Sequence, residues 1–136
     1  EGLSDVVAIA GGYVHSMALT SSGEVVAWGN NGEGQTDIPE GLNDVVAIAG
    51  GGHYSMALTS TGEVVAWGQN VKGQVDVPEG LTDVVAISSI GSLYSLAITL
   101  SGDVIVTILL FLAIFCPFSY RFTYYERPKD KKVSLV

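Results

Sequence analysis

The sequence predicts an all-β fold made of repeated units, followed by a C-terminal segment of a different kind. Two observations carry this prediction. The first 103 residues are rich in β-branched runs, glycines and tight-turn signals, and no stretch of about 10–15 residues before Asp103 has helical periodicity. All 17 glycines lie at or before Gly102, so the composition changes abruptly there.

The repeat has a period of 39 residues. Glu1-Gly2-Leu3 returns at residues 40–42 and again at 79–81, and residues 1–39 and 40–78 are identical at 29 of 39 positions. This identity indicates duplication, and a period between about 20 and 50 residues is typical of stacked or radial repeat architectures. The predicted repeat region is 1–103, divided into repeats 1–39, 40–78 and 79–103.

Each unit predicts short antiparallel strands. In the first repeat a β-branched run over residues 5–10 stops at two glycines, and residues 16–20 and 25–28 read as strands joined by a turn containing Gly23. A polar, glycine-rich loop follows and ends at Pro39. Three to four short strands with one Trp-Gly pair per unit are typical of a β-propeller blade.

Two segments of the repeat resemble the regulator-of-chromosome-condensation repeat. They are residues 5–20, which read DVVAIAGGYVHSMALT, and residues 23–39, which read GEVVAWGNNGEGQTDIP. The short spacing and the Gly-Gln-x-Asp-x-Pro ending are similar to the compact bacterial form of the family, which includes the propeller-type β-lactamase inhibitor protein. The resemblance covers residues 1 to about 103 and implies a partial β-propeller with two full blades.

The third repeat departs from this pattern and predicts a degenerate blade. It has one extra residue between Ile87 and Tyr94, and Thr107-Ile108 stands in place of the Trp-Gly pair. Propellers of this family close with about seven blades, whereas fewer than three repeats are present here. We therefore expect a fragment of a larger propeller, or a chain that self-associates through open blade edges.

The C-terminal part divides into a hydrophobic segment, 104–122, and a basic tail, 123–136. The 17 residues from Val104 to Tyr120 carry no charge. One interpretation is a single transmembrane helix, with the repeats outside and the basic tail in the cytoplasm. A second is a buried β-segment, because residues 104–106 align with 64–66. A third is a coding artefact.

Charge and cysteine content limit the classes of partner and site. Residues 1–103 hold twelve acidic residues and one base, Lys72, so their net charge is −11, and the whole chain carries −8. This charge argues against nucleic acid and favours basic partners. The single cysteine, Cys116, excludes an intrachain disulfide framework and a multi-cysteine metal site.

The predicted function follows from where the two full repeats differ. Most differences fall at positions 13–15 with their counterparts 52–54, and at loop positions 30, 32, 33 and 36. We predict a noncatalytic protein–protein interaction module with an unidentified protein partner and with no catalytic residue, cofactor or metal. The alternatives are a membrane-anchored display protein and a regulatory factor, such as a guanine-nucleotide exchange factor by family analogy.

The candidate residues form two groups. The predicted partner contacts are Tyr13, His15, Asn30, Glu33, His53, Tyr54, Gln69 and Lys72. The predicted framework residues of the repeat are Gly12, Trp28, Gly29, Gly34, Gly51, Trp67, Gly68 and Gly73. We expect the two tryptophans to pack within the blades.

Overall fold

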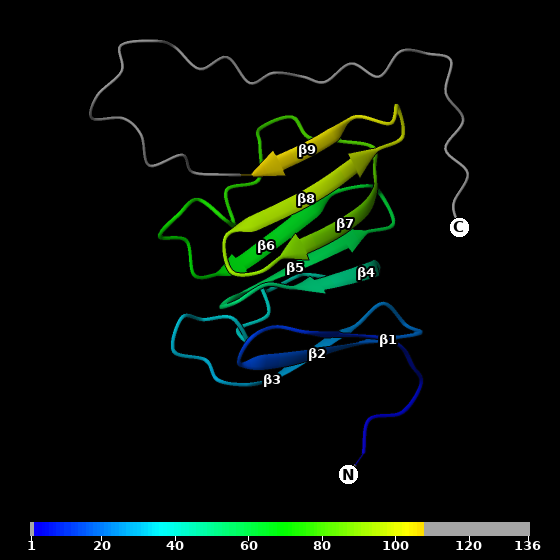
Figure 1. Ribbon diagram of the computed structural model, residues 1–136. Coiled ribbons are helices and arrows are strands. Elements are labelled where there is room, and N and C mark those ends of the chain that lie inside the picture. Colours follow the sequence, from blue (N-terminus) through cyan, green and yellow to red (C-terminus); the bar gives the residue numbers. More distant parts are fainter. Residues whose placement is uncertain (1, 108–136) are drawn as a thin grey trace, which may run out of the picture.

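The computed structural model describes residues 2–107, which form three antiparallel sheets of three strands each (Figure 1). Within each sheet the strands lie in chain order. We call the sheets blades 1, 2 and 3. Their strands are β1 (Val6–Gly11), β2 (His15–Thr20) and β3 (Val25–Gly29); β4 (Val45–Gly50), β5 (Tyr54–Thr59) and β6 (Val64–Gly68); and β7 (Val84–Ile90), β8 (Tyr94–Thr99) and β9 (Val104–Thr107). The all-β prediction is confirmed for these residues. The first two sheets lie within the predicted repeats 1–39 and 40–78, whereas the third sheet extends to Thr107, beyond the predicted end of the repeat region at residue 103.

Each blade begins with an aspartate in the left-handed backbone region. The φ angles of these residues lie between 53° and 57°, a conformation that a short polar side chain tolerates better than a branched one. The main-chain oxygen of each accepts a hydrogen bond of 2.8–2.9 Å from the turn between the second and third strands, and a register irregularity follows in the first strand. The three residues are Asp5, Asp44 and Asp83.

Two apolar clusters join the blades in a stack, with blade 1 at one end and blade 3 at the other (Figure 1). The first lies between blades 1 and 2, and its buried members are Met17, Leu19, Val25, Val45, Ala57 and Trp67. The second lies between blades 2 and 3, and its buried members are Tyr54, Met56, Leu58, Val64, Val84 and Ala97. Blade 2 contributes to both clusters, so its two faces are covered.

The third blade keeps the three-stranded sheet and differs in the details that its sequence predicts. Strand β7 is one residue longer than β1 or β4, which accommodates the extra residue. In β9, Thr107 pairs with Ser95, where Trp67 pairs with Ser55 in blade 2. The loss of the tryptophan at this position is therefore confirmed.

The hydrophobic segment 104–122 begins as a strand. Residues 104–107 are β9, which pairs with β8 in the register that the alignment with residues 64–66 predicts. The remainder of the proposed membrane helix and the basic tail 123–136 lie outside the described residues. Within residues 2–107 there is no helix long and apolar enough to span a membrane.

Candidate functional site

The sequence differences between the two full repeats gather at one end of the blades. Eight of the ten differing positions lie in the turn between the first and second strands, at the start of the second strand, or in the loop after the third strand. Main-chain hydrogen bonds of 2.9 Å hold turn and loop together, from Asn30 N to Val14 O and from Gln69 N to His53 O. We call this end the loop face; it comprises turns 12–14 and 51–53 and loops 30–38 and 69–77.

Residues shared by both repeats fix the shape of each loop. The Asn31 amide donates to the Asp37 carboxylate over 2.6 Å, and Asn70 and Asp76 make the same bond. The side-chain oxygen of the buried Gln35 accepts from the main-chain N–H of Glu33 at 2.9 Å. Gln74 repeats this bond with residue 72 at 2.8 Å. The same hydrogen bonds therefore hold both loops in one shape, and the residues that differ between the repeats lie between these hydrogen-bonded positions.

Each loop is also anchored to the following blade. The main-chain oxygen of Gln35 accepts hydrogen bonds from the Ser55 hydroxyl at 2.8 Å and from the Trp67 indole at 3.1 Å. The main-chain oxygen of Gln74 accepts from Ser95 at 2.6 Å. The sequence analysis did not include Gln35 and Gln74 among the framework residues. The signal that could have identified them is the Gly-Gln pair, which is identical in the two loops.

His15 and Tyr54 do not lie on the loop face, and we correct their assignment as partner contacts. Their exposed fractions are 4% and 0%, because each side chain enters the junction with the next blade. The ring nitrogen Nε2 of His15 lies 2.9 Å from the Ser55 hydroxyl, and the Tyr54 hydroxyl donates to Tyr94 O at 2.5 Å. Both residues join blades and leave no surface for a partner.

The hydrogen bonds of His15 show which ring nitrogen carries a proton. The Ser55 hydroxyl donates its proton to Gln35 O, so it accepts a hydrogen bond from Nε2–H of His15. Its Nδ1 is buried and has no hydrogen-bond partner among residues 2–107. Burial, with a smaller contribution from nearby His53, lowers the pKa of His15 below its ordinary value of 6.5.

Two glycines make room for these rings. A Cβ on Gly12 would lie 2.1 Å from the His15 ring and 2.5 Å from Gly51 O, and a Cβ on Gly51 would lie 1.9 Å from the Tyr54 ring. The other framework glycines have φ angles between 72° and 114°, which favour glycine. These four are Gly29, Gly34, Gly68 and Gly73.

The other predicted contacts lie on the loop face with different exposure. Tyr13 has an exposed fraction of 82%, and its ring centroid is 6.2 Å from that of the half-buried His53. Glu33 is exposed and Lys72 is half-buried. The side-chain oxygens of Asn30 and Gln69 each accept a hydrogen bond from the buried glutamine of their own loop. These six residues therefore remain the candidate contacts: Tyr13, Asn30, Glu33, His53, Gln69 and Lys72.

A shallow groove of about 240 Å³ lies beside Tyr13, at the ends of the first strands. Glycines of all three blades form much of its lining, which is Gly11, Gly12, Tyr13, Gly50, Gly51, Gly52, Ser89, Gly91 and Ser92. Main-chain bonds cross it, from Tyr13 N to the carbonyl oxygens of Gly51 and Gly52 and from Gly52 N to Gly91 O. The loop face thus contains a shallow groove lined largely by glycines, with one aromatic side chain, Tyr13, beside it.

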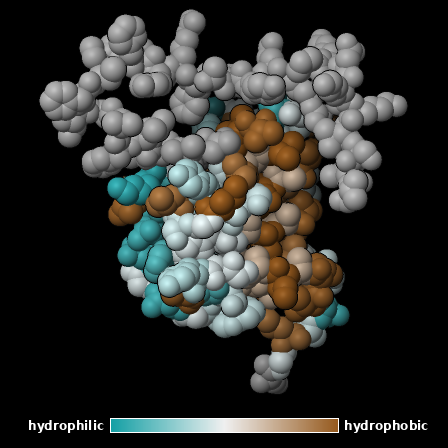
Figure 2. Space-filling model, viewed as in Figure 1, coloured by the Kyte–Doolittle hydropathy of each residue, from teal (hydrophilic) through white to brown (hydrophobic). Residues whose placement is uncertain are grey.

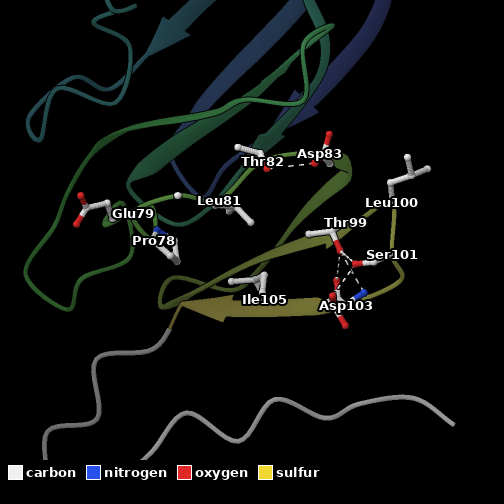
Figure 3. A pocket seen from close by; sticks show the side chains of 11 residues that line it. Pro78, Glu79, Leu81, Thr82, Asp83, Thr99, Leu100, Ser101, Asp103 and Ile105 are labelled. Atoms are coloured by element: carbon white, nitrogen blue, oxygen red, sulfur yellow. Dashed lines mark hydrogen bonds between the residues drawn. The ribbon is translucent and has the colours of Figure 1, made fainter.

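A larger groove belongs to the repeat framework. It measures about 620 Å³ and lies between the linker that follows Pro78 and the hairpin of β8 and β9 (Figure 3). Its counterpart in blade 2, of about 300 Å³, is lined by the equivalent linker that follows Pro39. Because the groove recurs with the repeat, we assign it no separate function. Among residues 2–107, no three or more His, Cys, Asp or Glu side chains are grouped so that they hold a metal.

Comparison with known proteins identifies the repeat. Residues 6–35 and 45–74 match the family described as regulator of chromosome condensation (RCC1) repeat. A search of curated protein sequences finds no significant match. The fold and these matches define a repeat protein of the propeller class. Over residues 6–74 the chain belongs to the RCC1-type repeat family.

Solved structures extend this relationship. Prp20p from Saccharomyces cerevisiae is similar with a TM-score of 0.63 and 27% identity, over 74% of this chain and 30% of Prp20p. Yeast RCC1 (Prp20) bound to Kap60 gives a TM-score of 0.62 and 29% identity, over 74% of this chain and 29% of that one. Human WBSCR16, at 20% identity and a TM-score of 0.64, shares the fold over 79% of this chain and 36% of its own. The chain thus spans about a third of the length of these proteins.

Proposed function

We propose that this chain is a noncatalytic protein-binding module whose contact surface is the loop face. One observation carries the proposal: residues that shape the loops are the same in both repeats, and the residues presented between them differ. At equivalent positions the first loop presents the acidic Glu33 and the second the basic Lys72. A fixed frame with changing presented residues is what selective recognition requires.

The similar proteins support a protein as the class of partner. The structure of Prp20p was described together with its binding properties to Gsp1p and histones, and that of yeast RCC1 was determined bound to Kap60. The net charge of −11 over residues 1–103 favours a partner with a basic surface, through faster encounter at low salt.

The test exchanges the loops within the chain and leaves its composition unchanged. The tagged full chain is used to capture proteins from an extract of its own cells, and captured proteins are identified by mass spectrometry. In the test variant residues 30–36 and 69–75 exchange places. In the control variant the differences at the opposite end exchange places, Ser4 with Asn43 and Ser22 with Thr61.

We expect the control variant to retain the captured protein and the loop variant to lose it. Retention by both variants, with unchanged circular dichroism, would show that the contact surface lies elsewhere. The noncatalytic part of the proposal is tested separately by measuring guanine-nucleotide release from a small GTPase. Accelerated release by the native chain would contradict it.

A further inference from the structure

The loops after the third strands of blades 1 and 2 share their hydrogen bonds but differ in the residue that follows one asparagine. In loop 30–38 Asn31 precedes Gly32, and in loop 69–77 the equivalent Asn70 precedes Val71. Both asparagines are exposed, and hydrophilic side chains gather on the side of the molecule where these loops lie (Figure 2). The two amides therefore meet water alike and have equivalent partners, but their neighbours in the chain are different.

The neighbour in the chain decides whether an asparagine amide is lost without an enzyme. The main-chain nitrogen of the next residue attacks the side-chain carbon Cγ, loses its proton and forms an N–Cγ bond, while Nδ2 takes up a proton and leaves as ammonia. Water then opens the cyclic imide at either carbonyl, which gives an aspartate or an isoaspartate. Glycine favours the attack because it has no Cβ, whereas the β-branched side chain of valine crowds the attacking nitrogen.

The fold of loop 30–38 does not require a glycine at position 32. The φ angle of Gly32 is not positive, unlike that of Gly34, which is 78°. A Cβ on Gly32 would meet only the side-chain oxygen of Asn30, at the ordinary contact distance of 3.4 Å. In blade 2 this place is taken by Val71, which is 65% exposed. A valine therefore fits the same loop, and the residue at position 32 is free to be exchanged in a test.

Three hydrogen bonds restrain the atoms that would react. The leaving nitrogen, Asn31 Nδ2, donates to the Asp37 carboxylate at 2.6 Å, and the side-chain oxygen of Asn31 accepts from Thr36 N at 3.0 Å. The attacking nitrogen, Gly32 N, donates to Asn30 Oδ1 at 3.0 Å. Ring closure takes the proton from Gly32 N and expels Nδ2, so it breaks the bonds to Asn30 and Asp37. The loop therefore slows the reaction, and Asp37 holds the leaving group.

We propose that Asn31 is a site of spontaneous deamidation, slowed by its hydrogen bond to Asp37, and that Asn70 is its stable counterpart. The product has a carboxylate in place of the amide that donated to Asp37. Two ionised carboxylates repel each other and neither donates a proton, so the hydrogen bond that closes loop 30–38 is lost. This goes beyond the proposed function, because the modification needs no partner; where the loop face binds a protein, it alters one of the two loops.

The test uses the full 136-residue chain, kept folded in mildly alkaline buffer, in which the attacking nitrogen loses its proton more readily. At intervals the peptides that contain residues 31 and 70 are compared by mass spectrometry in the same digest. Gly32→Val gives the first loop the neighbour that Asn70 has, and Val71→Gly does the reverse. Asp37→Ala releases the leaving amide. Its control, Glu33→Gln, removes a charge from the same loop and leaves the hydrogen bonds of Asn31 in place.

We expect the amide at residue 31 to be lost about tenfold faster than that at residue 70, or more, because of the crowding by valine. Gly32→Val removes this difference, and Val71→Gly raises the rate at residue 70 toward that at residue 31. Asp37→Ala accelerates the loss at residue 31 by about two- to tenfold, as for one hydrogen bond, and Glu33→Gln does not. Equal slow loss at both positions overturns the proposal, and so does loss at residue 31 only after unfolding in urea. An unchanged rate in Asp37→Ala overturns the part assigned to Asp37.

The effect on the loop is measured by amide hydrogen exchange of the modified chain. The N–H groups of Thr36 and Val75 donate to the side-chain oxygens of Asn31 and Asn70. After deamidation we expect faster exchange at Thr36 and unchanged exchange at Val75. Unchanged exchange at both would show that the first loop keeps its shape, which overturns the predicted opening. None of these measurements uses a partner, so their outcome is separate from that of the loop-exchange test.

Discussion

Gly12 lies under the ring of His15, and the neighbouring Gly11 lies in open space. A methyl group at position 12 meets both the imidazole and the main chain of blade 2, whereas nothing lies within 4 Å of one at position 11. We predict that Gly12→Ala destabilises the fold by about 1–3 kcal/mol, the usual cost of overpacking. Gly11→Ala changes stability by less than about 0.5 kcal/mol. Urea unfolding of both variants checks this, and equal effects would show that the ring of residue 15 moves aside freely.

His15 makes stability depend on pH. Burial and nearby His53 lower its pKa in the folded state, while in the unfolded chain the pKa is the ordinary 6.5. Below about pH 6.5 His15 therefore binds a proton in the unfolded chain more strongly than in the folded chain. The free energy of unfolding consequently falls as the pH falls. We predict a larger loss of stability between pH 7.5 and pH 5.5 for the native chain than for His15→Gln. Parallel losses in thermal unfolding of the two chains would contradict this.

Residue roles were the part of the site that sequence reasoning predicted least well. The difference between His15 and Tyr54 in the two repeats suggested variable contacts on the surface. The structure shows instead that both side chains are buried in equivalent places. Each ring packs over a glycine and makes a hydrogen bond to the next blade. Burial of this kind depends on a neighbour 40 residues away, and a local pattern does not reveal it.

At the scale of strands and blades the sequence was a better guide. β-branched runs and glycine turns placed the three strands of blades 1 and 2, because these signals are local. The last strand of blade 3, β9, lies in the segment 104–122, for which a β-segment was only one of three interpretations. The aspartates with positive φ and the irregularity after them were not predicted, since nothing in the residue pattern marks the extra residue of a bulge. The junctions were expected from the repeat, but their polar contacts with Gln35 O and Gln74 O were not.

Comparing the two tryptophans separates the stability that comes from the junction between blades from the stability that comes from packing within a blade. Trp67 packs in the first cluster and donates to Gln35 O, whereas Trp28 has similar sequence surroundings and is 48% exposed, with no blade among residues 2–107 packed over it. We predict that Trp67→Ala costs about 3–5 kcal/mol. Trp28→Ala costs less than about half as much at concentrations where the chain is monomeric. Denaturant unfolding with circular dichroism detection measures both, and equal costs would mean that the junction contributes little.

The two tryptophans also report on the whole molecule through their emission, because the chain contains only two. In Trp67→Phe the remaining indole is Trp28, which is 48% exposed, and in Trp28→Phe it is Trp67, which is 7% exposed. We predict emission at longer wavelength and stronger quenching by acrylamide for Trp67→Phe than for Trp28→Phe, because the indole that remains in Trp67→Phe is in contact with water. Equal emission and equal quenching of the two variants would show that a further contact covers Trp28 in solution.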